Sequence, residues 1–362
     1  MIVTVLIFIA VLSILVLVHE FGHFITAKKA GAKVEEFGLG FPPRAFGIKR
    51  GETIYSINFL PFGGFVRIQG EDGSDRSDPK SFASKGILTR AFIVAAGVLM
   101  NLLLAVVLFS FAHAMGIVRE VDEDNIPANA KNVGVLINFV DKDSPAHGGE
   151  IRPGDVILSM ESEGERIDDI RSIQTVQDFT SMHLGKEVAI GLKRGGDVLE
   201  KTIIPRASPP EGEGAIGISM TYAGTISQPL YLAPIKGIES TAMFTIATFQ
   251  AFGDMAYKFF VTGSLQEEVA GPVGIAVLTG EVRQLGFVFL MQFMALISIN
   301  LAIINIFPFP ALDGGRLLFF LVEAIKGSPV NQKYEKMAHT VGFFILIALI
   351  ILITARDVGK FL

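Results

Sequence analysis

The chain has 362 residues, of which 50% are hydrophobic and 19% charged, and its formal net charge is −5. Together with a mean hydropathy of +0.51, this composition is typical of an integral membrane protein and gives no sign of nucleic-acid binding. The sequence contains no cysteine, which excludes disulfides and thiolate metal sites and leaves His, Asp and Glu as the available metal ligands.

Residues 2–27 are predicted to form the first membrane-spanning helix. Between residues 2 and 18 only Thr4 and Ser13 are polar, and the segment is long enough to cross the hydrocarbon core at about 1.5 Å per residue. It has no basic start and no small-residue cleavage site, so we interpret it as a retained span and not as a signal peptide.

The first span carries an H-E-x-x-H motif at His19, Glu20 and His23. Residues i and i+4 share one face of a helix, so the two imidazoles can bind one metal ion while Glu20 acts as a base on a water molecule. The alternative, polar side chains that snorkel from a helix end, conflicts with a cost of about 2.5–3.5 kcal/mol for an ionisable residue at mid-membrane depth. A catalytic zinc site of this kind needs a third protein ligand from elsewhere.

Three further segments are long and apolar enough to span, at residues 91–117, 286–307 and 340–355. The loop 28–90 is richer in Lys and Arg than in Asp and Glu, so the positive-inside rule places it in the cytoplasm and the N-terminus outside. Basic residues between the third and fourth spans agree with this orientation, whereas Arg356 and Lys360 in the C-terminal tail do not.

Within the cytoplasmic loop, the alternating segment 53–59 predicts a strand between the glycine-rich stretches 37–42 and 61–66. Apolar strands of this kind suggest a membrane-associated sheet that dips into the bilayer surface near the metal. A small cytoplasmic sheet without a catalytic part is an equally open interpretation.

Residues 119–207 are predicted to form a soluble, mainly β domain on the extracytoplasmic side. Strand-like segments occur at 133–140, and a hairpin is expected from 188–193 and 198–204. The turn Ser144–Ala146 and the Gly154-Asp155 pair before an apolar strand resemble a PDZ domain, which implies binding of an extended peptide or C-terminus by strand addition. His147 and His183 are interpreted as surface or packing residues.

The third ligand is predicted to be Asp313, which follows the third span within a turn fixed by prolines and glycines. The alternative is a helix-capping aspartate. To share the membrane side of His19 and His23, Asp313 must follow a span that runs inward. Residues 236–261, which are apolar but interrupted by polar side chains, are therefore predicted to lie in the interface as an amphipathic helix and not to cross.

The chain resembles the site-2 protease family, the bacterial intramembrane zinc metalloproteases with PDZ domains. The two specific motifs are H-E-x-x-H at His19–His23 and N-x-x-P-x-P-x-L-D-G at Asn305–Gly314. Further matching segments follow the family's order: Gly40–Pro43, Pro61–Gly64, Gly97 with Asn101, and Gly271–Gly274.

This resemblance implies a Zn²⁺ endopeptidase that cleaves the transmembrane segments of single-pass proteins, such as an anti-sigma factor or remnant signal peptides. It places the protein in the bacterial inner membrane within the lipid bilayer, with both termini extracytoplasmic. The residues that it assigns to substrate binding are Asn305, Pro308, Pro310, Gly63, Gly64 and Asn101. A non-proteolytic PDZ scaffold with a structural metal site is the alternative, but structural zinc sites are usually closed by four protein ligands.

The expected architecture is a polytopic α-helical membrane protein with four spans, a membrane-associated β-sheet and one inserted PDZ-like domain. The first two spans, with the motif and the strand loop, occupy residues 1–118, and the PDZ-like domain occupies 119–207. A linker and the interfacial helix occupy 208–285, and the last two spans, with the L-D-G motif, occupy 286–362.

Overall fold

The computed structural model describes residues 2–123, 125–168, 170–210, 212–262 and 270–361. They divide into two compact units. The first unit comprises Met1–Ser110, Pro234–Gly280 and Met291–Leu362, and the second comprises Phe111–Ala233 and Glu281–Leu290.

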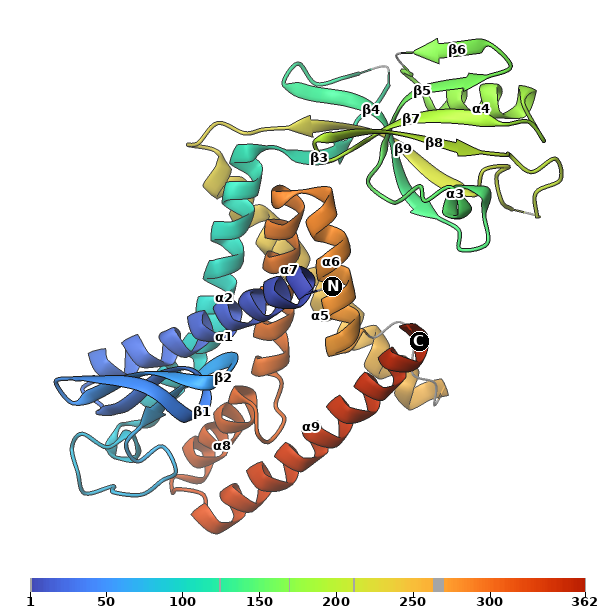
Figure 1. Cartoon of the computed structure of the whole chain (residues 1–362). Coiled ribbons are helices and arrows are strands. Elements are labelled where there is room, and N and C mark those ends of the chain that lie inside the picture. The colour runs from blue at the N-terminus through green and yellow to red at the C-terminus, as the bar shows by residue number, and fades with distance from the viewer. Residues whose placement is uncertain (1, 124, 169, 211, 263–269, 362) are drawn as a thin grey trace. The chain divides into compact units, whose positions relative to one another are not determined.

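Helices make up most of the first unit (Figure 1). In chain order, the long helices of the chain are α1 (Ile2–Lys29), α2 (Ile87–Met115), α5 (Ala233–Thr262), α6 (Pro272–Leu285), α7 (Phe287–Ile306), α8 (Asp313–Lys326) and α9 (Gln332–Phe361). A short 3-10 helix, η1 (Phe82–Ser84), precedes α2.

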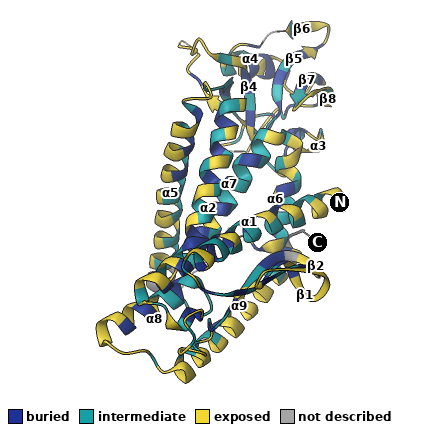
Figure 2. Cartoon of the chain, turned by 90° about the vertical axis from the view of Figure 1, so that its left-hand side faces the viewer, coloured by how far each residue is buried: buried dark blue, intermediate teal, exposed yellow. Residues whose placement is uncertain are grey.

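Among the described residues, four helices are long and apolar enough to cross a membrane, namely α1, α2, α7 and residues 332–359 of α9. They coincide with the four predicted spans. Most of α9 is exposed (Figure 2), including its apolar side chains Phe344 and Ile351. Such a surface would be unfavourable in water and suits contact with lipid.

Helix α5 covers the predicted interfacial segment 236–261 and is not one of these four helices. Its Phe244 stacks on Phe109 of α2, with ring centroids 5.4 Å apart, and Phe252 packs against the buried cluster formed by α2 and α7. These contacts identify the face of α5 that is turned toward the protein, while its interfacial position stays a prediction.

Glycines bring α1 and α2 unusually close together. A Cβ atom on Gly22 would lie 2.3 Å from the carbonyl oxygen of Ala96, and one on Gly97 would lie 2.5 Å from Nε2 of His23. Small residues allow helix backbones to approach in this way. The H-E-x-x-H motif is therefore pressed directly against α2.

A long antiparallel hairpin of β1 (Val34–Arg50) and β2 (Thr53–Ile68) lies along α1. The predicted strand 53–59 is the first part of β2, and Ser13 of α1 donates a hydrogen bond to the carbonyl of Pro61, 2.9 Å away. Inside the hairpin, burial alone would raise the pKa of Glu36, but hydrogen bonds from Ser56 and Arg44 hold it below its ordinary value.

The second unit contains a seven-stranded sheet in the order β3-β9-β4-β5-β7-β8, with β6 paired to β5. Its pairings are antiparallel. The strands are β3 (Ile117–Glu120), β4 (Ala130–Val140), β5 (Val156–Ser162), β6 (Glu165–Asp168), β7 (Val188–Arg194), β8 (Asp197–Ile203) and β9 (Ile218–Ile226). Helices α3 (Pro145–Gly148) and α4 (Ile173–Met182) accompany it, and Phe179 of α4 is buried in the core with Ile157 and Ile190.

The predicted strand 133–140 and the predicted hairpin 188–204 are present in this sheet. The sheet nevertheless continues beyond the predicted boundary at residue 207, because β9 pairs with both β3 and β4. The intervening segment 205–217 is rich in proline and glycine, which is typical of a linker. The composition of this segment gives no indication that the chain returns to the sheet as β9.

The Gly154-Asp155 pair leads to a buried ion pair in this unit. The side chain of Asp155 is fully buried and receives two 2.7 Å hydrogen bonds from Arg194. It also accepts the backbone N–H of Arg152 at 2.9 Å. Hydrogen bonding to Asp155 raises the pKa of Arg194, so the arginine stays charged and the carboxylate stays paired.

We predict that Arg194→Met destabilises the sheet by about 3 kcal/mol, because it leaves a buried carboxylate unpaired. Hydrogen exchange of β5 and β7 amides in the full-length protein measures this loss. Arg166→Met is the matched control, since Arg166 and its partners Glu161 and Asp168 are exposed and such pairs contribute below about 1 kcal/mol. Equal protection in both variants would contradict the prediction.

Candidate metal centre

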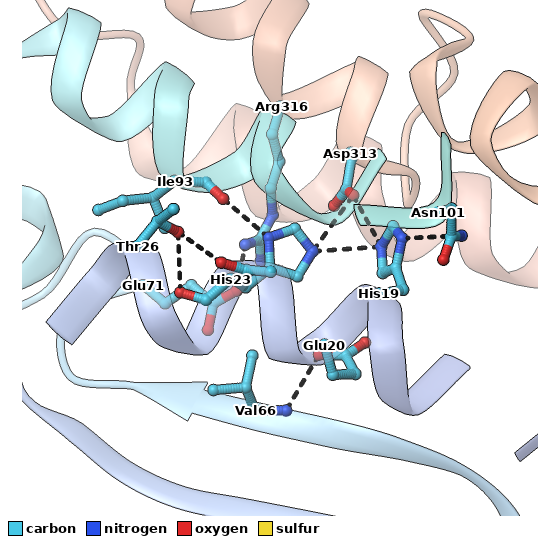
Figure 3. A network of polar contacts seen from close by, with 11 residues as sticks. His19, Glu20, His23, Thr26, Val66, Glu71, Ile93, Asn101, Asp313 and Arg316 are labelled. Atoms are coloured by element: carbon cyan, nitrogen blue, oxygen red, sulfur yellow. Dashed lines mark hydrogen bonds and ion pairs between the residues drawn. The ribbon is translucent and has the colours of Figure 1, made fainter. Parts of the chain in front are cut away.

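His19 and His23 lie one helical turn apart on α1 and are both buried. Their Nε2 atoms are 3.2 Å apart and their rings meet edge to face. The motif therefore forms as predicted, with two imidazole nitrogens directed at one point between the helices (Figure 3).

Asp313 reaches the same point from the first residue of α8 (Figure 3). Its Oδ2 atom is 3.0 Å from Nε2 of His19 and 3.4 Å from Nε2 of His23. No side-chain cap is formed at this helix N-terminus, where Leu312 is the capping residue. The geometry thus favours the ligand interpretation of Asp313 over the capping one.

The spacing of these three groups fits zinc. Tetrahedral ligand atoms about 2.0–2.1 Å from a zinc ion lie roughly 3.3 Å from one another, close to the separations between His19, His23 and Asp313 given above. Burial alone would raise the pKa of Asp313, but the neighbouring imidazoles of His19 and His23 hold it well below its ordinary range. The carboxylate is therefore ionised, as metal binding requires.

Groups on α2 orient both imidazoles. Nδ1 of His23 donates to the carbonyl of Ile93 at 2.9 Å, which leaves Nε2 free to bind a metal. Nδ1 of His19 lies 3.3 Å from the amide nitrogen of Asn101, whose Oδ1 is buried and has no hydrogen-bond partner among the described residues. Turning this amide over would make Oδ1 the acceptor for an Nδ1 proton on His19, which is the arrangement that a metal bound at Nε2 requires.

Glu20 lies on the side of α1 that faces the hairpin. Its Oε2 accepts the backbone N–H of Val66 in β2 at 3.1 Å (Figure 3). Glu20 and the three candidate ligands line one cavity of about 710 Å³. The carboxylate is therefore held beside the histidines without occupying a ligand position.

The cavity combines chemical groups from distant parts of the sequence. The hairpin contributes Gly64 and Val66, and α9 contributes His339 and Phe343. Arg316 of α8 also lines it and forms an ion pair with Glu71. Burial alone would lower the pKa of Arg316, but the Glu71 carboxylate raises it above its ordinary value.

The predicted substrate-binding residues fall into three groups. Gly64 lines the cavity, and Gly63 lies next to it with a positive φ of +71° beside Val16. Asn101 contacts a candidate metal ligand and not the cavity wall. Asn305, Pro308 and Pro310 are not among the residues that line the cavity and lie in or before the turn that leads to Asp313.

Sequence reasoning missed His339, Arg316 and Glu71. His339 lies seven residues inside α9 and lines the cavity. A single histidine on an apolar helix carries no spacing signal. Arg316 follows the L-D-G motif by a few residues, but its partner Glu71 lies 245 positions away.

Comparisons with known proteins agree with this chemistry. The model of peptidase family M50 matches residues 7–349. Putative zinc metalloproteases of Clostridium perfringens and Clostridium acetobutylicum are 36% and 34% identical to this chain, with 96% of it aligned to 96% and 94% of theirs. The regulator of sigma-W protease RasP of Bacillus subtilis is 29% identical, with 99% of this chain aligned to 98% of RasP.

The match therefore covers nearly the whole chain, including both motifs that carry the candidate ligands. The expected enzyme class and the expected Zn²⁺ are confirmed by the same relatives. This chain belongs to peptidase family M50, the site-2 protease family, and is a zinc metalloprotease.

Proposed function

We propose that this protein is an intramembrane endopeptidase that cleaves the transmembrane segments of single-pass membrane proteins. His19, His23 and Asp313 hold the zinc ion and Glu20 is the catalytic base. The observation that carries the proposal is the burial of two histidines on a candidate membrane span, within 3.4 Å of a carboxylate from a second helix.

Zinc, when bound, makes a water molecule acidic and polarises the carbonyl of a peptide bond. Glu20 accepts the proton of that water and returns it to the nitrogen of the leaving amine. The N–H of Val66 orients the Glu20 carboxylate for both transfers. Asn101 and the Ile93 carbonyl keep the imidazole rings from rotating.

The substrate must unwind before its carbonyl can react, because a membrane helix keeps its carbonyls hydrogen-bonded. The hairpin next to Glu20 offers extended backbone for this purpose, and Gly64 brings that backbone to the cavity wall. Apolar side chains such as Phe46, Ile57 and Phe59 are exposed on the hairpin. They support the proposal that this sheet dips into the bilayer surface.

The sheet of the second unit is proposed to be a PDZ domain that takes an extended peptide or C-terminus, or that filters substrates by size. The Ser-Pro-Ala turn begins α3, and Gly154-Asp155 precedes β5, as the resemblance requires. The lysine- and arginine-rich loop 28–90 supports an inner-membrane orientation with extracytoplasmic termini. By analogy with the name of RasP, the substrate class includes regulators of sigma factors.

A non-proteolytic scaffold is the competing function. A structural metal site is usually closed by four protein ligands. Here three candidate ligands meet, and Glu20, whose carboxylate is not among them, lines the same cavity. These features favour the peptidase.

Glu20→Gln is predicted to lower peptidase activity by about 100- to 10,000-fold, with zinc content unchanged. The amide keeps the hydrogen bond from Val66 but cannot take a proton. Cleavage of a single-pass substrate in detergent and metal analysis of the same sample provide the two readouts. Glu52→Gln, which changes an exposed carboxylate of the hairpin loop, is the control. Loss of zinc together with activity would make Glu20 a ligand.

Asp313→Asn is predicted to weaken zinc binding strongly, because the amide is a neutral and poorer ligand than the carboxylate. A capping residue would lose little stability in the same substitution. Titration of the apoprotein with zinc against a chelator measures the affinity, and Asp72→Asn at an exposed carboxylate is the control. Wild-type zinc affinity in Asp313→Asn would show that another residue completes the site.

The orientation is tested with single cysteines, since the natural chain has none. Asp254→Cys in α5 is predicted to react with an impermeant thiol reagent from the extracytoplasmic side. Asp75→Cys in the 69–85 loop is predicted to react only after the membrane has been permeabilised. Reaction of both cysteines from the same side would exclude the proposed topology.

A further inference from the structure

The turn that delivers Asp313 contains a residue in an unfavourable conformation. Ala311 has a φ of +80°, in the left-handed region that L-residues other than Asn and Asp rarely adopt. The other non-glycine residues with positive φ in the described part of the chain are Asp75, Asn132, Glu150 and Glu163. Each of those has a polar side chain, whereas the methyl group of Ala311 offers no local hydrogen bond.

The stabilisation of Ala311 comes from another helix. Its backbone N–H donates to Nδ1 of His339 in α9 at 2.9 Å. The His339 ring packs against Phe319 of α8, with centroids 5.5 Å apart. One imidazole therefore links the turn, α8 and α9 at a point two residues before the candidate ligand.

Helix α9 supports the same turn at a second point, one turn further along. A Cβ atom on Gly342 would lie 2.4 Å from the carbonyl oxygen of Pro310. The absence of a side chain at Gly342 lets α9 press against the peptide that immediately precedes Ala311. The turn is thus held by a hydrogen bond and by close packing, both from α9.

We propose that His339 is a positioning residue for the metal centre: by accepting the N–H of Ala311, it holds the left-handed turn that directs the Asp313 carboxylate at His19 and His23. This inference rests on the proposed ligand role of Asp313. It makes the fourth span a structural part of the metal site, although α9 supplies no ligand. Substitution of a residue that orients a metal ligand, without binding the metal itself, typically lowers metal affinity by about 10- to 100-fold.

The decisive experiment is a double-substitution cycle in the full-length protein. His339→Phe keeps an aromatic ring against Phe319 but removes the acceptor, and it is expected to weaken zinc binding about 10- to 100-fold. Ala311→Gly alone is expected to bind zinc nearly as the wild type does. Glycine adopts positive φ without steric cost, so the double variant should recover most of the affinity lost in His339→Phe.

Neither a packing role for His339 nor direct contact with substrate predicts this recovery. If Ala311→Gly fails to restore zinc affinity, or if His339→Phe binds zinc as the wild type does, the proposal is overturned. His339→Asn provides a second route, because the Asn Oδ1 takes the place of Nδ1 and should keep most of the affinity. A His339→Asn variant as weak as His339→Phe would also contradict it.

A pair of glycines on α9 provides an independent test. Gly342→Ala is expected to displace the Pro310 carbonyl and to weaken zinc binding about tenfold. This is the range found for substitutions of residues that support metal ligands without binding the metal. Gly359→Ala is the matched control, since nothing lies within 4 Å of a Cβ at that position. Equal zinc affinity in both variants counts against the role of α9. Asp313→Asn in the same titration separates this failure from failure of the proposed ligand set.

Discussion

The structure depends on the requirement that every ionisable group between the helices has a partner. An unpaired carboxylate or imidazolium in an apolar setting costs several kcal/mol. Asp313 meets His19 and His23, and those imidazoles contact Asn101 and the Ile93 carbonyl in turn. Satisfying this requirement fixes α1, α2 and α8 relative to one another, so the candidate metal centre also serves as the junction of the helices.

Two further ion pairs surround that junction. Arg90 of α2 donates two hydrogen bonds to Glu323 of α8, at 2.7 and 3.1 Å, and Arg316 of α8 pairs with Glu71. Buried pairs contribute little net stability, but losing one partner of the buried Arg90–Glu323 pair is costly, so a shift of α8 by one turn is strongly disfavoured. These pairs therefore define the register of α8, the helix that begins with Asp313.

The sequence predicted the parts of this arrangement that rest on local patterns. The four spans follow from apolar length, and the i, i+4 spacing of His19 and His23 places both on one helix face. Asp313 was predicted from its place after the third span, in a turn fixed by prolines and glycines, within a chain that has no cysteine. The predicted strand 133–140 and the predicted hairpin 188–204 of the second unit are present.

What local patterns could not supply are contacts between distant segments. Strand β9 was placed in a linker because a stretch rich in proline and glycine precedes it, and only its pairing with β4 reveals its role. Helix α8 was not predicted as a separate element, because it follows the Pro-Gly turn within a loop between spans. His339 lies 28 residues from Ala311, and no periodicity links an imidazole in one helix to a backbone N–H in a turn.

The hydrogen bond that orients Glu20 comes from the main chain of Val66 and not from a side chain. Every amino acid except proline carries that N–H. Substitutions of Val66 by residues other than proline can therefore alter the shape of the cavity wall while the backbone N–H that donates to Glu20 is kept. The orientation of Glu20 is therefore insensitive to side-chain identity at position 66, where substitutions can reshape the cavity wall over evolutionary time.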